Sequence, residues 1–340
     1  MSERKKILVT GGAGYIGSHT VVELYNSGFE PIILDDFRNS EEFIIDRIQQ
    51  IINNEVILYK GACQDSDLLQ MIFEAHEISG VIHFAAYKAV GESVKDPLMY
   101  YENNIGSLLS ILRCLEVYKV KNFVFSSSCS VYGDHPKLGN GITEEAGDLK
   151  PQSPYANTKL IGEQIITDWK VNQPDTNVCL LRYFNPVGAH ESAKIGELPL
   201  GVPNNLLPFI TQTAAGIREQ LTIFGNDYNT EDGTCIRDYI HVVDLANAHV
   251  KSLEWLLSEN GVIDVFNVGT GKGSSVLEIV TKFEELTKVS LNWSFGPRRT
   301  GDVPVVFADN KKVKESLKWV PEYTVDDAIV HAWEWQKSLE

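Results

Sequence analysis

An α/β fold built on a doubly wound parallel sheet is predicted by three features of the first half of the chain. A short apolar strand, residues 6–10, runs directly into a glycine-rich turn and then into a helix that extends to about residue 26. A second apolar run, residues 31–34, ends in two acidic residues. Short apolar strands then keep alternating with helices, which is typical of parallel sheets covered by helices on both faces.

The glycine-rich turn is suited to holding a dinucleotide. Its spacing is G-x-x-G-x-x-G, with Gly11, Gly14 and Gly17. Glycines there allow a tight turn, close backbone approach to a pyrophosphate, and a phosphate held at the helix N-terminus. Asp35 and Asp36 follow the second apolar run, where a carboxylate can accept hydrogen bonds from the adenosine ribose. Arg38 is near, but no arginine directly follows the strand, so the sequence predicts NAD rather than NADP.

The alternation of strands and helices continues through the first half. We expect strands at residues 55–59, 80–84 and 122–126, and helices at residues 66–77 and 103–118. Ala85 and Ala86 are small residues that follow the strand 80–84, where open α/β sheets form a crevice. Lys88 can reach a phosphate from there, or it is a solvated surface lysine.

A helix turn with the pattern Tyr-x-x-x-Lys provides a candidate acid/base pair. Ser153 is a good helix N-cap, and Pro154 suits the first helical position. Tyr155 and Lys159 then lie four residues apart on one helix face. A tyrosine that acts as a base near neutrality needs a pKa lowered by about 3 units. The lysine and the positive helix N-terminus are both expected to lower it; the alternative is a surface tyrosine beside a solvated lysine.

Three serines at the end of the strand 122–126 favour the catalytic interpretation. They are residues 126–128, upstream of the helix turn. A serine hydroxyl can orient a substrate hydroxyl while Tyr155 exchanges its proton and Lys159 holds the nicotinamide ribose. Serines in loops are usually turn formers, but a glycine turn, an acid, strand-end serines and Tyr-x-x-x-Lys in this order are much rarer than any one of them.

Composition excludes several functional classes. The chain has 340 residues, 43% of them hydrophobic, which is enough for a full core in two lobes. Its net charge of −16, with no basic stripe, argues against a nucleic-acid partner. No apolar run approaches the roughly 20 residues of a membrane span, nor a signal sequence. The five cysteines form no CxxC pair, so we expect a cytoplasmic protein with reduced thiols and no metal site.

The ordered set of motifs resembles the extended short-chain dehydrogenase/reductase family of nucleotide-sugar enzymes, whose dinucleotide domain is of the Rossmann type. Within that family, several longer sequence stretches are similar to those of the 4-epimerases of UDP-galactose and UDP-glucose. The resemblance covers essentially the whole chain. The stretches that carry the closer resemblance are residues 10–20 (TGGAGYIGSHT), 81–93 (VIHFAAYKAVGES), 182–188 (RYFNPVG), 201–207 (GVPNNLL), 225–243 (GNDYNTEDGTCIRDYIHVV) and 297–304 (PRRTGDVP).

The resemblance implies a reaction and a set of cofactor contacts. NAD would stay bound, take hydride from C4 of the hexose, and return it to the other face of a rotated 4-keto intermediate. Tyr155 would be the acid/base, with Ser128 beside it and Lys159 on the cofactor ribose. The other implied cofactor contacts are Gly11, Gly14, Tyr15, Ile16, Gly17, Asp35, Asp36, Phe84, Ala85, Ala86, Lys88, Asn103, Ser126 and Phe184.

The loop-rich second half is expected to bind the UDP-sugar. Arg237 and Arg299 are the local cations that a diphosphate needs in so acidic a protein, unless they form surface ion pairs. Phe224 is a candidate wall for the uracil, and Asp302 could accept hydrogen bonds from the ribose. With Lys88, Ser128 and Tyr155, the implied substrate contacts are Asn185, Asn204, Asn205, Leu206, Thr222, Phe224, Arg237, Tyr239, Arg299, Asp302 and Val306.

The two lobes are expected to interleave in sequence. The NAD-binding lobe would comprise residues 1–186 and about 239–268, and the smaller UDP-sugar lobe about 187–238 and 269–340. By resemblance we expect a homodimer. One departure from the family pattern is the pair Ala62-Cys63, where an acid and an aliphatic residue usually contact the adenine. The adenine end could therefore be held more weakly, although NAD should still copurify with the protein.

The residues present disfavour two rival functions and leave room for a broader substrate range. A nucleotide-sugar 4,6-dehydratase needs an Asp-Glu pair after the strand-end serine, but those positions are Cys129 and Ser130. A non-enzymatic NAD sensor could lose the acid/base residues, yet Tyr155 and Lys159 are both present. Strict epimerases of the family carry a tyrosine where this chain has Val306, so the N-acetylated substrates UDP-GlcNAc and UDP-GalNAc could also fit.

Overall fold

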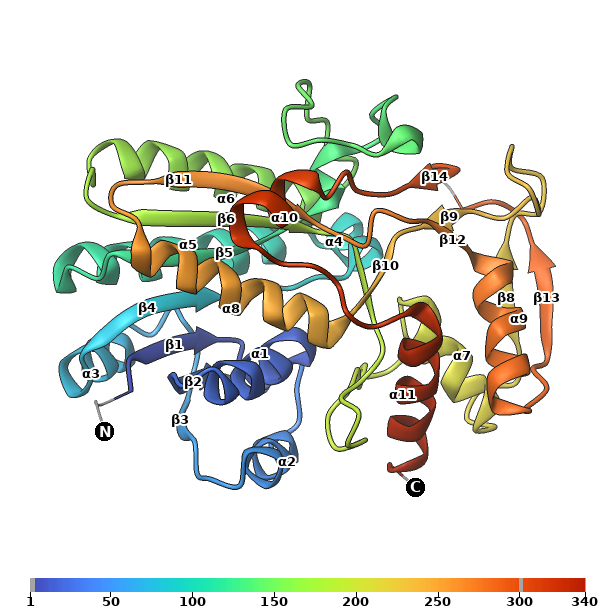
Figure 1. The fold of residues 1–340 in the computed structure, drawn as a ribbon, viewed down its shortest axis with the longest axis horizontal. Helices are drawn as coiled ribbons and strands as arrows, with labels where there is room; N and C mark the ends of the chain where they lie inside the picture. The colour runs from blue at the N-terminus through green and yellow to red at the C-terminus, as the bar shows by residue number, and fades with distance from the viewer. Residues whose placement is uncertain (1–3, 300–301, 340) are drawn as a thin grey trace.

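The central element of the fold is a seven-stranded parallel sheet (Figure 1). The computed structural model describes residues 4–299 and 302–339. Its strands are β1 (Lys6–Thr10), β2 (Glu30–Asp35), β3 (Ile57–Lys60), β4 (Ile78–His83), β5 (Asn122–Ser128), β6 (Asn177–Tyr183) and β11 (Ile263–Val268). They lie in the order β11-β6-β5-β4-β1-β2-β3, and all neighbours are parallel. The strand order reverses between β1 and β4, which is where such sheets bind dinucleotides.

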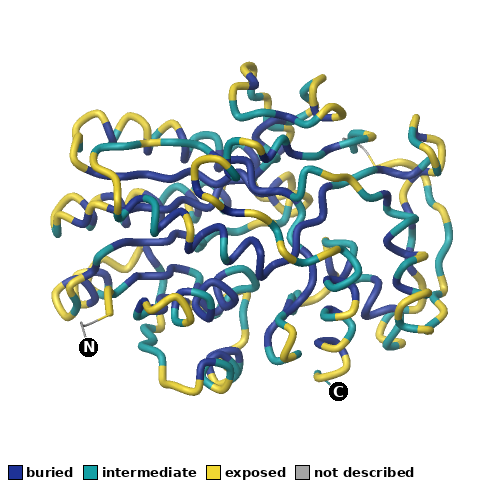
Figure 2. The backbone as a smooth tube through the Cα atoms, in the orientation of Figure 1, coloured by how far each residue is buried: buried dark blue, intermediate teal, exposed yellow. Residues whose placement is uncertain are grey.

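Helices cover both faces of this sheet, as predicted. Successive side chains of a strand point to opposite faces, so Ile7 and Val9 pack with one helix layer and Leu8 with the other. The first layer is formed by α1 (Tyr15–Asn26), α2 (Phe43–Ile52) and α8 (Val242–Ser258); the second by α3 (Ser66–Ala75), α5 (Pro97–Tyr118) and α6 (Pro154–Val171). The central strands are accordingly buried (Figure 2).

A smaller group of elements packs around its own core. It contains α7 (Leu206–Ala214), α9 (Val276–Thr287), α11 (Val325–Lys337) and the parallel pair β8 (Leu221–Phe224) and β13 (Trp293–Gly296). Between this group and the large sheet lie two small sheets, β7 (Asn185–Val187) with β10 (Tyr239–His241), and β9 (Ile236–Arg237) with β12 (Ser274–Ser275) and β14 (Val305–Val306). The remaining elements are α4 (Val90–Lys95), α10 (Lys311–Leu317) and the 3₁₀ turns Cys129–Tyr132 and Leu138–Asn140. In the chain, β11 follows α7, β8, β9 and β10, yet it pairs with β6 at the edge of the large sheet.

The predicted element boundaries needed several corrections. The helix expected from residue 103 begins at Pro97, because the Asp96 side chain accepts a hydrogen bond from Met99 N at 3.2 Å and caps it. The strand expected at residues 55–59 is shifted to 57–60, and the strand 122–126 continues through Ser128. Helices α2, α4, α7 and α10 had no counterpart among the predicted elements.

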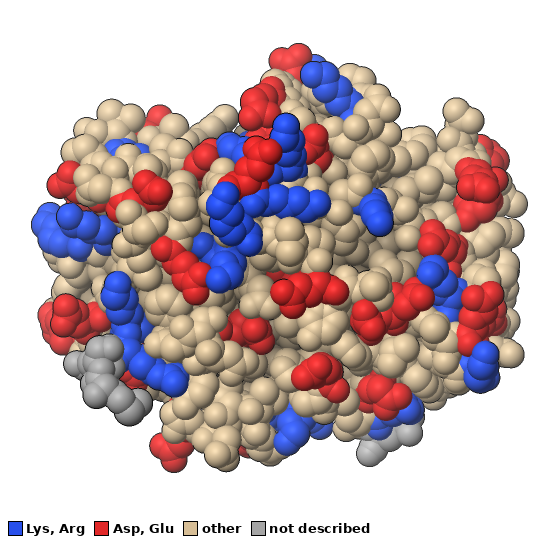
Figure 3. Space-filling model, viewed as in Figure 1, with Lys and Arg blue, Asp and Glu red and all other residues tan. Residues whose placement is uncertain are grey.

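The surface carries both signs of charge despite the net charge of −16. On the face seen in Figure 3, lysine and arginine side chains are interleaved with aspartate and glutamate. Across residues 4–299 and 302–339, no helix has the length and apolarity that crossing a membrane would require.

Buried histidines should make stability depend on pH. Burial lowers the pKa of His19, His83 and His241 to about 3, and that of His249 to about 4. Below pH 6.5 the unfolded chain therefore binds protons that the folded chain does not, and the free energy of unfolding falls as the pH drops. Each buried histidine contributes up to about 1.4 kcal/mol per pH unit in this window.

We expect the variant His249→Phe to isolate one such contribution. Unfolding in urea at pH 7.5 and pH 5.5 gives the acid-induced loss of stability for each protein. That loss should be about 1.4 kcal/mol smaller in the variant, because one proton-binding site is removed from its unfolded state. Buried carboxyls such as Asp244, whose pKa is raised to about 6, act in the opposite direction but are common to both proteins. Equal losses in the two proteins would contradict the expectation.

Candidate active site

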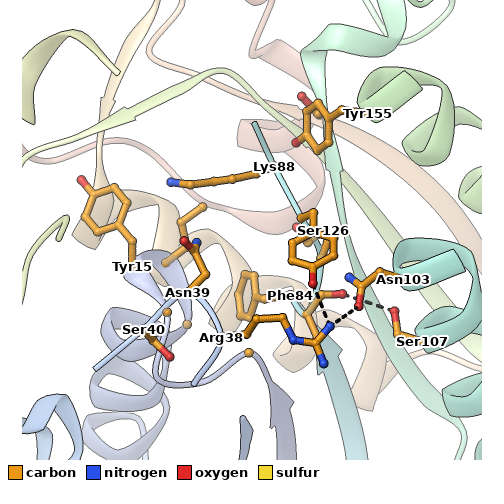
Figure 4. Close-up of a pocket in the computed structure, with 18 of the residues that line it drawn as sticks. Tyr15, Arg38, Asn39, Ser40, Phe84, Lys88, Asn103, Ser107, Ser126 and Tyr155 are labelled. Carbon is orange, nitrogen blue, oxygen red and sulfur yellow. Dashed lines mark hydrogen bonds between the residues drawn. The ribbon is translucent and has the colours of Figure 1, made fainter. Parts of the chain in front are cut away.

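One cleft lies over the carboxyl ends of the parallel strands (Figure 4). Its walls come from the turns after β1, β2, β3, β4 and β5, from α5 and α6, and from the segment after β6. The residues of the predicted cofactor set all line it: Gly11, Gly14, Tyr15, Ile16, Gly17, Asp35, Asp36, Phe84, Ala85, Ala86, Lys88, Asn103, Ser126, Tyr155, Lys159 and Phe184. The structure thus brings together residues separated by more than 170 positions, from Gly11 to Phe184.

The glycine turn has no room for side chains at two of its positions. Gly11 has a φ of +70°, and a Cβ there would lie 2.9 Å from Ala85 N. A Cβ on Gly17 would lie 2.1 Å from Gly11 O, which is impossible without moving the backbone. Gly14 is the N-cap of α1 and carries no side chain that could cap the helix. The first N–H groups of α1 therefore remain available to a phosphate.

Asp35 fixes this turn in place. Its Oδ2 accepts a hydrogen bond from Ala13 N at 2.9 Å, and its Oδ1 accepts from Phe37 N and Ser40 Oγ, each at 2.9 Å. Burial raises the pKa of Asp35, while these three hydrogen bonds act to lower it. A carboxylate has about four acceptor positions, so one remains on Oδ2 for a ligand hydroxyl. Asp36 is instead paired with Arg38, at 2.9 Å.

The Tyr-x-x-x-Lys turn forms as predicted at the start of α6. Ser153 Oγ accepts a hydrogen bond from Ala156 N at 3.2 Å, and Pro154 occupies the first turn. Lys159 is 5% exposed, and its Nζ donates to Ser126 O at 2.6 Å. Burial lowers the pKa of Lys159 to about 8, and the Glu163 carboxylate acts to raise it. The lysine is therefore anchored at the end of β5, beside the strand-end serines.

The expected direction of the Tyr155 pKa shift is wrong. Burial raises the pKa of Tyr155 to about 12, while a hydrogen bond with the Ser128 side chain acts to lower it. The protein's own groups thus keep the phenol protonated at neutral pH, because loss of water around the phenolate outweighs the nearby favourable contacts. Cys129 is also neutral, since burial raises the pKa of its thiol to about 12.

A buried polar network behind the serines was not predicted from the sequence. Glu163 forms a two-pronged ion pair with Arg182, at 2.6 and 2.9 Å, and also accepts a hydrogen bond from Ser127 Oγ. Arg182 donates to Tyr132 OH at 3.1 Å. Tyr183 lines the cleft and hydrogen-bonds Ser126 Oγ. The residues 126–128 are thereby each fixed by a different partner: Tyr183 for the first, Glu163 for the second and Ser130, whose Oγ donates at 2.9 Å, for Ser128.

A second unpredicted residue, Glu197, joins the two sides of the cleft. Its Oε1 accepts from Lys88 Nζ at 2.9 Å and from Asn205 Nδ2 at 2.7 Å. Lys88 follows β4 of the large sheet, whereas Asn205 directly precedes α7 of the smaller group. No short motif marks Glu197, because its partners lie 109 and 8 residues away in sequence.

The predicted substrate set is only partly gathered at this cleft. Lys88, Ser128, Tyr155, Asn185 and Asn205 line it. Outside its lining are Asn204, Leu206, Thr222, Phe224, Arg237, Tyr239, Arg299, Asp302 and Val306. Thr300 and Gly301, within the quoted stretch 297–304, lie outside the described residues.

Several of those outer residues contact one another. Asp302 pairs with Arg237 at 3.4 Å and with Arg299 at 3.2 Å, and the Arg299 guanidinium lies 5.1 Å from the centre of the Phe224 ring. Val306 stands opposite Arg237 in the pairing of β14 with β9. Tyr239 is buried in the core of the smaller group, and burial raises its pKa. The two arginines that a diphosphate would need are therefore adjacent, although each is already paired with a carboxylate.

Metal chemistry has no obvious ligand set in the part of the chain that the structure describes. Within residues 4–299 and 302–339, no group of three or more His, Cys, Asp or Glu side chains could hold a metal ion. The residues that could hold a cofactor are those of the glycine turn and the strand ends, whose features suit a dinucleotide: a backbone-only phosphate cradle, a carboxylate acceptor and a buried lysine.

A family model, curated relatives and solved structures all relate the chain to nucleotide-sugar enzymes. The family model described as GDP-mannose 4,6 dehydratase matches residues 8–331. A UDP-glucose 4-epimerase of Yersinia pestis is 48% identical over 330 residues, which cover 97% of each chain. The crystal structure of UDP-glucose-4-epimerase from Stenotrophomonas maltophila with bound NAD and formylated UDP-arabinopyranose superposes with a TM-score of 0.95, 41% identity and 99% coverage of both chains. The UDP-glucose 4-epimerase from Bifidobacterium longum, in complex with NAD+ and UDP, superposes with a TM-score of 0.94, 42% identity and 98% coverage of both chains.

Proposed function

We infer the function from one premise: the chain belongs to the UDP-glucose 4-epimerases, within the nucleotide-sugar family whose model carries the name of a 4,6-dehydratase. It is an NAD-dependent isomerase that interconverts UDP-galactose and UDP-glucose through a 4-keto intermediate. The observation that carries this conclusion is the cleft itself, in which a dinucleotide cradle at one end leads to Tyr155, Ser128 and Lys159 at the other.

The dehydratase reaction is disfavoured by the residues that follow Ser128. Elimination of water across C5–C6 requires a titratable acid/base pair within reach of the substrate. The two positions hold Cys129, a neutral buried thiol, and Ser130, whose Oγ donates to Ser128. We therefore propose Tyr155 as the group that moves a proton at the sugar, which suits redox at one carbon.

The chain's own residues would divide the work in the following way. Bound NAD supplies the hydride acceptor and donor for hexose C4. Tyr155 would exchange a proton with the hexose O4; because its pKa is raised, it is loaded as the acid and needs nearby positive charge to act as the base. The Lys159 ammonium, anchored on Ser126 O, is the cation that the protein itself provides. Ser128 would share a hydrogen bond with the reacting hydroxyl and hold it toward Tyr155.

A direct test uses the purified protein without added cofactor. We expect UDP-galactose to be converted to UDP-glucose with no net accumulation of NADH, since the hydride taken from C4 is returned to it. Chromatography of the nucleotide sugars and absorbance at 340 nm give both quantities. A 4-keto-6-deoxy product would contradict the epimerase assignment, and protein without releasable NAD would contradict the cofactor assignment.

We further propose that N-acetylated UDP-hexosamines are accepted. Val306 packs in one hydrophobic cluster with Phe184, which lines the cleft, so its side chain is a neighbour of the site. A valine is smaller than the tyrosine of strict epimerases, which leaves space for an acetamido group.

The variant Val306→Tyr should lose turnover of UDP-N-acetylgalactosamine while keeping most turnover of UDP-galactose, because the added ring fills that space. Val305→Tyr is the matched control, since neighbouring residues of a strand point to opposite faces. Coupled assays with each substrate measure the ratio of the two activities. If the unmodified protein does not turn over UDP-N-acetylgalactosamine, the proposal is wrong.

Three further proposals concern organisation. We assign residues 1–186 and about 239–268 to NAD binding, and residues 187–238 and 269–340 to UDP-sugar binding.

A homodimer is supported by exposed apolar side chains on neighbouring helices, such as Val94 of α4 (62% exposed) and Leu98 of α5 (70% exposed). Light scattering tests this proposal. A cytoplasmic location is supported by the five free cysteines, three of them buried.

A further inference from the structure

The Arg38 side chain crosses the end of the cleft that faces the predicted adenosine site (Figure 4). Its NH1 donates to Tyr87 OH at 2.8 Å and to Asn103 Oδ1 at 3.4 Å. Its NH2 lies 2.9 Å from Asp36 Oδ2, and its guanidinium carbon lies 5.7 Å from the centre of the Tyr87 ring. All four residues line the cleft.

These contacts tie together loops from both sides of the glycine turn. Arg38 follows β2, Tyr87 follows β4, and β1 with its glycine turn lies between those two strands in the sheet. Gln64, which follows β3, reaches the same point, because its Nε2 donates to Asn103 O at 3.1 Å and to Asn103 Oδ1 at 3.2 Å. Asn103 is therefore the common acceptor for side chains from two loops, and the bridge spans the carboxyl end of β1.

The residues beneath this bridge offer little to a purine base. Gly61, Ala62 and Cys63 line the cleft here, and the first two bring no polar side chain. Cys63 is 4% exposed, and burial raises the pKa of its thiol to about 12, so it brings no charge. At this end of the cleft, the planar or amide side chains within the described lining are those of Arg38, Asn39, Gln64, Tyr87 and Asn103.

We propose that Arg38 is an adenine-binding residue of this protein, and that its bridge to Tyr87 and Asn103 retards NAD release. A guanidinium is planar and weakly hydrated, so it stacks well on an aromatic ring, and Arg38 is held for this by Asp36 on one edge and Tyr87 on the other. The contact would supply a polar partner that the methyl side chain of Ala62 cannot. This proposal about Arg38 rests on the NAD-dependent function proposed for the chain.

The same geometry disfavours a role in binding the 2′-phosphate of NADP. The Arg38 charge is matched by Asp36, and Asp35 places a second carboxylate beside the ribose position. A phosphate dianion there would meet two carboxylates for one guanidinium, so the adenine face is the better partner for Arg38.

The test is the rate at which the holoenzyme exchanges its bound NAD for labelled NAD, followed by rapid gel filtration. We expect Arg38→Ala to exchange about fivefold faster than the unmodified protein, as for the loss of one exposed cation–π contact. The exchange rate of Arg38→Lys should be close to that of Arg38→Ala, because a lysine keeps the positive charge but not the planar guanidinium group. Arg298→Ala is the matched control: Arg298 also pairs with an aspartate, Asp227 at 2.6 Å, and lies 4.2 Å from a tyrosine ring, but at the smaller lobe. Its exchange rate should be unchanged.

Each outcome bears on one claim. Exchange by Arg38→Ala at the unmodified rate, or more slowly, would overturn the proposal, as would full rescue by lysine. A preference for NADP that is lost in Arg38→Ala would assign the residue to a 2′-phosphate instead, and so would also overturn it. Unmodified protein that contains no NAD at all would contradict the proposed function rather than the role of Arg38. Arg38 is half exposed at the surface, so thermal unfolding of the variant should match that of the control.

Discussion

The Tyr155→Phe variant should lose about 10²- to 10⁴-fold in kcat for UDP-galactose while still copurifying with NAD. We propose that the phenolic hydroxyl, which lies in the cleft, exchanges a proton with the hexose O4. Removing it leaves the ring, the helix cap and the cofactor cradle as they are, because α6 begins at Pro154 and is capped by Ser153. The effect should therefore fall on turnover rather than on cofactor binding.

Tyr101→Phe provides a matched control for this experiment. Tyr101 OH accepts a hydrogen bond from Asn157 Nδ2 at 2.6 Å, so the same deletion of a hydroxyl occurs against the same helix. Tyr101 does not belong to the described cleft lining, and we expect near-normal turnover. Steady-state kinetics and the NAD content of both variants give the comparison. Comparable losses in the two variants would point to a structural effect, and full activity of Tyr155→Phe would remove Tyr155 as the acid/base.

The second large effect is expected from Arg182→Met, which should cost about 3–5 kcal/mol in the free energy of unfolding. The side chains of Arg182 and Glu163 are only 6% and 7% exposed, so the variant leaves a carboxylate buried without its cation. It also removes the donor to Tyr132 OH. Urea unfolding measures the loss.

Two comparisons show whether the cost in stability comes from the burial of this ion pair or only from the loss of a charge. Lys251→Ala breaks the exposed pair with Glu254 on α8 and should cost less than about 1 kcal/mol. The double variant Arg182→Met, Glu163→Leu should be more stable than Arg182→Met alone, because it removes the stranded charge. If breaking the buried and the exposed pairs cost the same, or if the double variant were the less stable, the account of this network would be wrong.

Local sequence patterns predicted the cofactor side of the cleft. The glycine turn, the acids after β2 and the cap of α6 each depend on residues within a few positions of one another, and the alternation of strands and helices then fixes which ends meet. The predicted cofactor residues consequently line one cleft. Their individual roles in binding stay predictions.

Contacts between distant segments were beyond sequence reasoning. The pairs Glu163–Arg182 and Lys88–Glu197 join residues 19 and 109 positions apart, and no short motif signals either. The sign of the Tyr155 pKa shift was missed for a related reason: a lysine four residues away is visible in the sequence, but the depth of burial that outweighs it is not. The start of α5, by contrast, does carry a local signal: Asp96 caps the helix and Pro97 occupies its first position.

The bridge made by Glu197 has a thermodynamic consequence for ligand binding. An anionic ligand that contacts the Lys88 ammonium competes with the Glu197 carboxylate for its positive charge, and so weakens one tie between the β4 side of the cleft and the start of α7. Binding free energy and the affinity of the two sides for each other are then linked, and the linkage is reciprocal. The contact of the two sides through Glu197 lowers the affinity for the ligand by a certain factor. Ligand binding lowers the affinity of the two sides for each other by the same factor.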